Sequence, residues 1–330
     1  MDAQIGYCTT SDNVRLAHAV SGAGPTLVRV GAWYTHLQHD WDLSGWSDLY
    51  RALGKRFQFV RYDVRGTGLS DRFPKEISVE TFVRDLETVV DALRLERFAL
   101  LGISQGGAVG ILYALRHPER VSHLIFLNAF ARGAGFREGV AQGLDVVNAM
   151  RALIRRGWGS DDPSFRAIFT TQMMPTATPD QAQRWNEFER VSVSPEVAER
   201  IFGAIHSEIK IVDRLSDLRV PTLVLHVRDD RRVPFEEGRM LAAHIPSARF
   251  VPIAGANHVL LPQDAGFGTA VEEICSFLGV RSASRLVRGV RTLGNTLRSA
   301  TKHFEASTYY TILAIVAAVA SIVSLIWTFK

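Results

Sequence analysis

Residues Gly102 to Gly106 form a G-x-S-x-G sequence that places a serine directly after the apolar run 98–101. A serine hydroxyl becomes a useful nucleophile when a tight turn holds it beside a general base. Glycines on both sides of Ser104 permit such a turn, because a crowded backbone leaves no room for Cβ atoms. A helical pattern follows, so the sequence predicts a strand, a sharp turn and a helix. Ser104 is therefore the candidate nucleophile.

A base and an acid for this serine lie further along the chain. His258 follows an apolar run at 249–253, and two adjacent aspartates, Asp229 and Asp230, follow another at 222–226. In this arrangement the acid comes after the serine and the histidine comes last. Asp230 is preferred because it stands four residues before Pro234, the usual spacing of the acid and a proline in such a loop. Asp229 is the alternative.

Each of these groups has a chemical role in acyl transfer. Ser104 would attack a carbonyl, His258 would remove and later deliver the proton, and Asp230 would orient the imidazole. The developing oxyanion needs preorganised donors. The backbone N–H of Gln105 is expected to be one, and that of Trp33 the other, with Ala32 as the alternative one position away.

The flanking sequence predicts the elements that position these groups. Strands are expected at 5–9, 14–20, 26–30, 57–62, 124–127, 222–226 and 249–253, and a helix near 78–94. Alternating strands and helices predict an α/β fold with a mainly parallel sheet covered on both faces. Between about 129 and 218 the strand pattern gives way to helical stretches at 137–156, 180–190 and 195–214, which predict an inserted cap.

Residues 1–280 resemble the α/β-hydrolase family, and more narrowly the hydrolase modules found with nucleotide cyclases or regulator domains in bacterial signalling proteins. The resemblance rests on the G-x-S-x-G turn, the stretch from Asp229 to His258, and the segments 31–33, 63–71, 117–121 and 221–226. In some relatives the acid follows the strand equivalent to 124–127. Here that position is Asn128, which cannot supply a negative charge.

The reaction expected from this set is hydrolysis of a carboxylic ester, lactone or thioester through an acyl-enzyme, with no cofactor and no metal. Two alternatives stay open: a binding or sensory module without turnover, and a carbon–carbon bond hydrolase or cofactor-free peroxidase-like enzyme with the same triad. Apolar cap residues are expected to line a pocket for an apolar, ester-like small molecule. Candidates for this lining are Trp158, Met173 and Met174.

Charge and composition limit the other classes. The net charge is +4, but residues 281–330 hold seven Lys or Arg against a single Glu, so the first 280 residues are slightly acidic. Nucleic-acid binding by the globular part therefore has no support. The two cysteines, Cys8 and Cys275, have no metal-ligand spacing and are expected to be reduced thiols.

The end of the chain predicts a membrane anchor. Residues 309–327 contain no charge and have aromatic residues at both ends, which indicates one membrane-spanning helix within 307–330. Residues 281–306 are basic and amphipathic, which is typical of a helix on an anionic membrane surface, or of a solvated linker. The basic flank places the catalytic domain on the cytoplasmic side. A small-residue face that could support a homodimer comprises Ala317, Ala320, Ser321 and Ser324.

Overall fold

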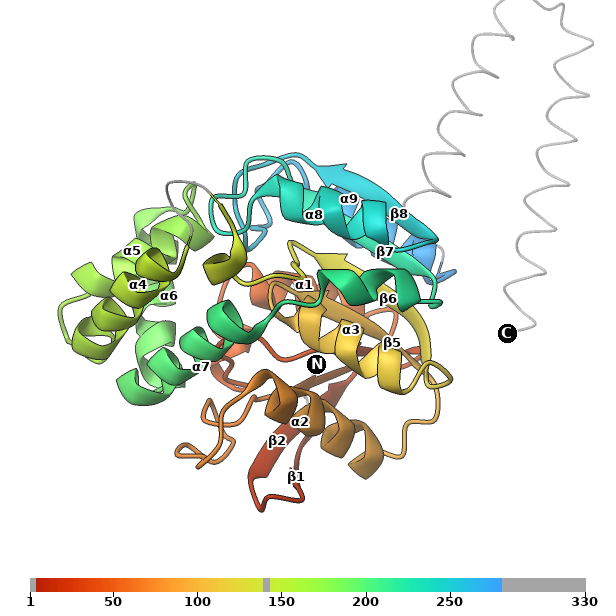
Figure 1. Cartoon of the computed structure of the whole chain (residues 1–330), viewed down its shortest axis with the longest axis horizontal. Coiled ribbons are helices and arrows are strands. Elements are labelled where there is room, and N and C mark those ends of the chain that lie inside the picture. The colour runs from red at the N-terminus through yellow and green to blue at the C-terminus, as the bar shows by residue number, and fades with distance from the viewer. Residues whose placement is uncertain (1–3, 139–142, 281–330) are drawn as a thin grey trace, which may run out of the picture. The chain divides into compact units, whose positions relative to one another are not determined.

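Within residues 4–138 and 143–280, which the computed structural model describes, the chain forms an eight-stranded sheet (Figure 1). Along the sheet the strands follow the order β1-β2-β4-β3-β5-β6-β7-β8. The β1–β2 and β2–β4 pairs are antiparallel and all the others are parallel, so the mainly parallel sheet predicted from the sequence is confirmed. The strands are β1 (Gln4–Thr9), β2 (Arg15–Ser21), β3 (Thr26–Arg29), β4 (Gln58–Tyr62), β5 (Phe98–Ile103), β6 (Val121–Leu127), β7 (Thr222–Val227) and β8 (Ala248–Ile253).

Helices cover both faces of this sheet (Figure 1). The helices α2 (Val79–Ala92), α3 (Gly106–Arg116) and α8 (Phe235–His244) lie on one face, and α1 (Trp46–Gly54) and α9 (Phe267–Phe277) lie on the other. β5 and β7 are buried along their whole length, which explains why their sequences are continuously apolar rather than alternating. The sequence patterns above predict α2 and α3 but do not include α1, α8 and α9.

A group of four helices fills the interval between β6 and β7. They are α4 (Leu144–Gly157), α5 (Ser164–Met173), α6 (Pro179–Ser192) and α7 (Pro195–Glu208). α4 begins later than the sequence suggests, because Gly143 has a φ of +102° that a helix cannot accommodate. α7 ends earlier, because Lys210 leaves the helix to form a β-bridge with Arg132. Helix α5 was not among the expected stretches.

The register of the parallel strands brings four loops to one edge of the sheet. Ile103 at the end of β5 lies beside Leu127 at the end of β6, and Leu127 lies beside Leu225 of β7. Val227, the last residue of β7, lies beside Ile253, the last residue of β8. The segments that follow these ends carry Ser104, Asn128, Asp230 and His258, so the sheet itself gathers them.

The predicted basic segment 281–306 and the predicted membrane helix 307–330 lie outside the described residues. In the part of the chain that the structure does describe, no helix has both the length and the apolar character needed to cross a membrane.

Candidate active site

Ser104 lies on the turn between β5 and α3 with a backbone φ of +54°. A non-glycine residue rarely adopts this conformation, and it persists only where the surrounding structure enforces it. The Ser104 N–H donates to Leu127 O at 3.1 Å, and Gly107 N–H donates to Ser104 O at 3.1 Å. A Cβ added at Gly102 would lie 2.6 Å from the Cα of Gly107. Glycine at 102 therefore makes the strained turn possible.

His258 and Asp230 meet through a hydrogen bond of 2.7 Å between the histidine Nδ1 and the aspartate Oδ2. Both side chains are buried. The other carboxylate oxygen accepts from the backbone N–H groups of Arg232 at 2.7 Å and Val233 at 2.9 Å, which fixes its orientation. Because the carboxylate accepts from Nδ1–H, the histidine Nε2 is free to act as a base. Asp229, the alternative acid, is exposed.

The loop that carries His258 is held by side-chain amides. Asn128 donates from Nδ2 to the carbonyl of His258 at 2.7 Å and accepts from Val227 N–H at 2.8 Å. Asn257 donates to both carboxylate oxygens of Asp264 at 2.9 Å and accepts from Thr176 N–H at 3.1 Å. These bonds place the imidazole relative to the sheet edge without using its ring nitrogens.

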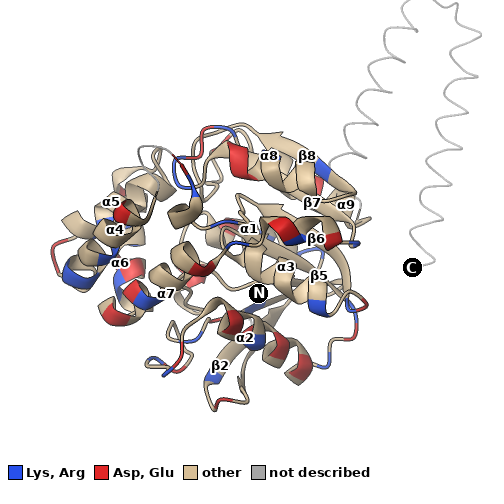
Figure 2. Ribbon diagram, in the orientation of Figure 1, with Lys and Arg blue, Asp and Glu red and all other residues tan. Residues whose placement is uncertain are grey.

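Backbone donors are available beside the serine. Among the residues that the structure describes, the N–H groups of Gln105, Trp33 and Ala32 have no hydrogen-bond partner. A Cβ at Gly106 would lie 3.3 Å from the carbonyl of Gly31, so the loop after β3 packs closely against the turn. α3 begins at this point and carries its one charged residue at the opposite end (Figure 2). The positive end of its dipole therefore faces the site with no charged residue of α3 beside it.

Ser104 and His258 line the same small cavity, with a volume of about 30 Å³. Its wall is largely aromatic and aliphatic. The body of the fold contributes Tyr34 and Trp46, and the cap contributes Met173 and Trp185. Trp33 and Gln105 also line the cavity, so the predicted oxyanion donors, the nucleophile and the base surround one space.

A comparison with protein-family models matches residues 39–265 to the alpha/beta hydrolase fold. The match covers more than half of the 330 residues. The chain belongs to the α/β-hydrolase family. The narrower resemblance to modules associated with nucleotide cyclases remains a prediction.

Individual relatives are hydrolases of different names. The chain is 29% identical over 266 residues to AB hydrolase superfamily protein YisY of Bacillus subtilis, covering 76% of this chain and 91% of the relative. It is 28% identical over 263 residues to 2-hydroxy-6-oxo-2,4-heptadienoate hydrolase of Pseudomonas putida, covering 75% and 84%. A solved hydrolase structure from Pseudomonas aeruginosa PA01 matches with a TM-score of 0.68 and 27% identity, covering 84% of this chain and 99% of that chain.

Two of the three predicted pocket residues of this α/β hydrolase do not line the cavity. Met173 does, whereas Trp158 and Met174 lie outside the lining. The Trp158 indole donates to Glu189 O at 3.0 Å and packs behind Trp33 with ring centroids 5.1 Å apart, so Trp33 separates it from the cavity. The lining residues that the sequence patterns did not indicate include Tyr34, Trp46, His206 and Arg232.

A buried carboxyl group supports the aromatic wall. Tyr34 OH donates to Glu189 Oε1 at 2.9 Å and accepts from Trp185 Nε1 at 3.2 Å. The Oε2 of Glu189 lies 3.3 Å from the hydroxyl of Thr170. Burial raises the pKa of Glu189 to about 8. At neutral pH the carboxyl is therefore mostly protonated. The aromatic wall is thus supported, on the side away from the cavity, by a polar but uncharged group.

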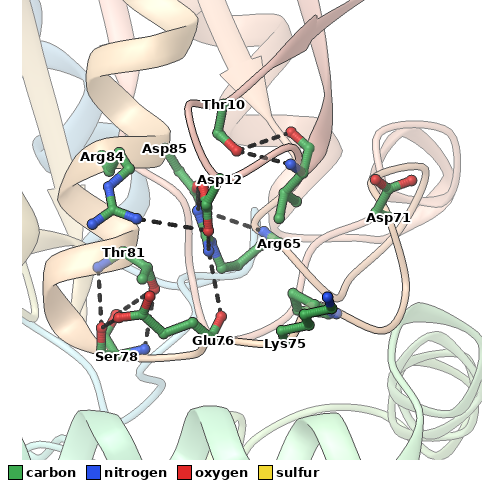
Figure 3. A network of polar contacts seen from close by, with 12 residues as sticks. Thr10, Asp12, Arg65, Asp71, Lys75, Glu76, Ser78, Thr81, Arg84 and Asp85 are labelled. Carbon is green, nitrogen blue, oxygen red and sulfur yellow. Dashed lines mark hydrogen bonds and ion pairs between the residues drawn. The ribbon is translucent and has the colours of Figure 1, made fainter.

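The D-x-R-G-x-G turn at 63–68 belongs to the framework of the hydrolase (Figure 3). Arg65 is fully buried and pairs with Asp85 at 2.6 Å and with Asp12 at 2.7 Å. It does not line the cavity. A Cβ at Gly68 would lie 2.2 Å from Asp63 Oδ2, so glycine is required where this carboxylate folds back on the turn. Through the two ion pairs of Arg65, the turn links the β1–β2 hairpin, which carries Asp12, to α2, which carries Asp85.

Proposed function

We propose that this protein is a serine hydrolase that cleaves a carboxylic ester, lactone or thioester through an acyl-enzyme. The observation that carries the proposal is the 2.7 Å bond between His258 Nδ1 and Asp230 Oδ2, with the histidine lining the same cavity as a serine held at a φ of +54°. Membership of the α/β-hydrolase family supports hydrolysis as the reaction class.

The proposed reaction follows from these positions. Ser104 Oγ attacks the carbonyl carbon while His258 Nε2 takes its proton, and the negative oxygen is stabilised by the N–H groups of Gln105 and Trp33. The bond to the leaving group then breaks, and His258 delivers the proton to it. A water molecule, deprotonated by the same nitrogen, attacks the acyl carbon. The bond from that carbon to Ser104 Oγ then breaks, His258 returns the proton to Oγ, and the acid is released. Asp230 stabilises the imidazolium in both halves.

Labelling by a fluorophosphonate probe tests the proposal. The native protein should react covalently at Ser104, because only an activated serine attacks such a probe at a useful rate. Ser104→Ala should abolish labelling, whereas Ser276→Ala, at an exposed position on α9, should leave it unchanged. Labelling that survives in Ser104→Ala would refute the assignment. Native protein that is folded but never labelled would favour the binding-module alternative.

A second candidate reaction is hydrolysis of an oxo acid at a carbon–carbon bond. One relative carries the name 2-hydroxy-6-oxo-2,4-heptadienoate hydrolase, and a ketone carbonyl could occupy the same oxyanion site. Both reactions use Ser104, so labelling does not separate them. Turnover of a 2-hydroxy-6-oxo dienoate measured beside a panel of esters and lactones does.

We also propose that residues 307–330 anchor the hydrolase in a membrane, with residues 281–306 on its cytoplasmic surface. The support is the uncharged stretch 309–327 and its basic flank in the sequence. Removing 281–330 should release the protein from carbonate-washed membranes while its hydrolase activity on soluble esters persists. Replacing Arg285, Arg288 and Arg291 with glutamine should leave it bound, because the apolar stretch remains. A full-length chain that washes off would overturn the anchor. The homodimer expected from the small-residue face would depend on residues 307–330, so the truncated protein should be a monomer.

A further inference from the structure

Arg232 is a positively charged side chain in the cavity of the proposed active site. It lies two residues after Asp230, on the loop that follows β7. Its guanidinium sits against the aromatic faces of Phe202 and Trp33, with its central carbon 5.3 Å and 5.7 Å from the ring centroids. Its hydrogen-bonding contacts are neutral: Gln172 Oε1 at 3.1 Å and His206 Nε2 at 3.0 Å. Arg232 therefore brings a cation to a mainly apolar wall.

Arg232 forms no direct ion pair in the described part of the chain, although the Asp230 carboxylate acts on it from beyond contact distance. The buried Arg61 pairs with Asp40 at 3.1 Å, and the buried Arg65 pairs with Asp85 at 2.6 Å. No carboxylate oxygen lies within ion-pairing distance of Arg232 among residues 4–138 and 143–280. Glu189, on the far side of the aromatic wall, is mostly protonated at neutral pH because burial raises its pKa to about 8. An unpaired cation in a site of low polarity favours an anionic ligand.

The contact between Arg232 and His206 is unfavourable, and an anionic ligand would relieve it. His206 Nδ1 lies 3.2 Å from the N–H of Ala134, and Nε2 lies 3.0 Å from Arg232 Nη2. Both neighbours are donors. Burial lowers the pKa of His206 well below its usual value, so the ring is neutral and can accept at only one nitrogen. One of the two contacts is therefore donor against donor, and it is relieved when Arg232 turns its N–H groups to an acceptor.

We propose that Arg232 binds a carboxylate on the substrate, so that the hydrolase acts on esters or lactones that also carry a free carboxylate. The inference deepens the proposed function and rests on it. A planar guanidinium can hold a carboxylate through two parallel hydrogen bonds, and in a poorly solvated cavity such bonds are strong. The cavity of about 30 Å³ must widen to admit such a substrate, and its aromatic wall would then contact the carbon chain between the carboxylate and the reacting carbonyl. The sequence predicts an apolar substrate, and Arg232 adds a charged end to it.

Matched substrates measure this preference. The monomethyl esters of succinic, glutaric and adipic acid are each compared with the corresponding methyl ester half-amide, which has nearly the same shape without the charge. The native enzyme should favour at least one half-acid over its half-amide by about 10- to 100-fold in kcat/KM. Arg232→Gln should remove the preference, and Arg232→Lys should restore part of it. Arg231→Gln, at the exposed neighbouring position, should keep it.

The result that overturns the inference is an equal loss on both substrates in Arg232→Gln, because a purely structural arginine affects the two alike. Absence of any preference in the native enzyme overturns it as well. Calorimetric binding of succinate, glutarate and adipate to the Ser104→Ala protein separates the two proposals. If no ester is hydrolysed but a dicarboxylate binds and Arg232→Gln removes that binding, the anion site stands and the hydrolase function fails. If esters are hydrolysed and no dicarboxylate binds, the anion site fails alone.

Discussion

Replacing Asp230 with asparagine is expected to lower kcat for ester hydrolysis about 10⁴-fold, the size of effect known when the acid of such a triad becomes an amide. Asp230 Oδ2 accepts from His258 Nδ1 at 2.7 Å, which keeps the proton on Nδ1 and leaves Nε2 as the base. An amide in the same place can donate to Nδ1 and so favour the opposite tautomer, in which Nε2 carries the proton. Steady-state rates and burst kinetics with an activated ester measure the loss.

Asp229→Asn is the matched control, because it makes the same chemical change at the neighbouring, exposed position. Its kcat should stay within about twofold of the native value, since surface substitutions away from the site have small effects. Circular dichroism checks that both variants are folded. If Asp229→Asn carried the large loss and Asp230→Asn did not, the acid would be misassigned.

Replacing Arg65 with methionine is expected to lower the free energy of unfolding by about 3–5 kcal/mol, because it leaves a buried carboxylate without its partner. Arg65 pairs with Asp85 at 2.6 Å, and both side chains are fully buried (Figure 3). Burial raises the pKa of Asp85 to about 6 even with this arginine present, so the ionised form is already costly. The loss should therefore be larger at pH 8 than at pH 5, where Asp85 can keep its proton.

Arg15→Met provides the comparison for that measurement. Arg15 and Asp71 also form an ion pair in this region, but at 3.9 Å and with both side chains substantially exposed. Its removal should change stability by less than about 1 kcal/mol. Urea denaturation of the three proteins at pH 5 and pH 8 gives the free energies. A similar small effect for both variants would show that the Arg65 cluster is not a support of the fold.

The sheet and its site could be predicted because their signals are local in the sequence. β5 and β7 are continuously apolar, and the glycines around Ser104 mark a turn that few other residues permit. The acid and the base follow two such strands, so parallel pairing alone brings Asp230 and His258 to the same edge. Chain order therefore carried most of the information about these residues.

The cap could be predicted only as helical, because its packing depends on contacts between distant segments. Whether a tryptophan lines the cavity or lies behind it depends on Trp33, which comes from the distant loop after β3 and packs against Trp158. Arg232 lies in a run of five charged residues, 228–232, and residue type alone does not show which of them faces inward. Its lack of a direct ion pair becomes visible only when its neighbours from α5 and α7 are in place.

Asn128 also bears on evolution within the family, in which the catalytic acid follows either β7, as here, or the strand equivalent to β6. Its amide donates to the carbonyl of His258 at 2.7 Å and accepts from Val227 N–H at 2.8 Å, so both ends of the group are in use. An aspartate at this position would set a carboxylate oxygen against that carbonyl, two acceptors at hydrogen-bonding distance. A lineage with this loop cannot move its acid to the end of β6 by one substitution, because the first step displaces the histidine that the new acid would have to serve.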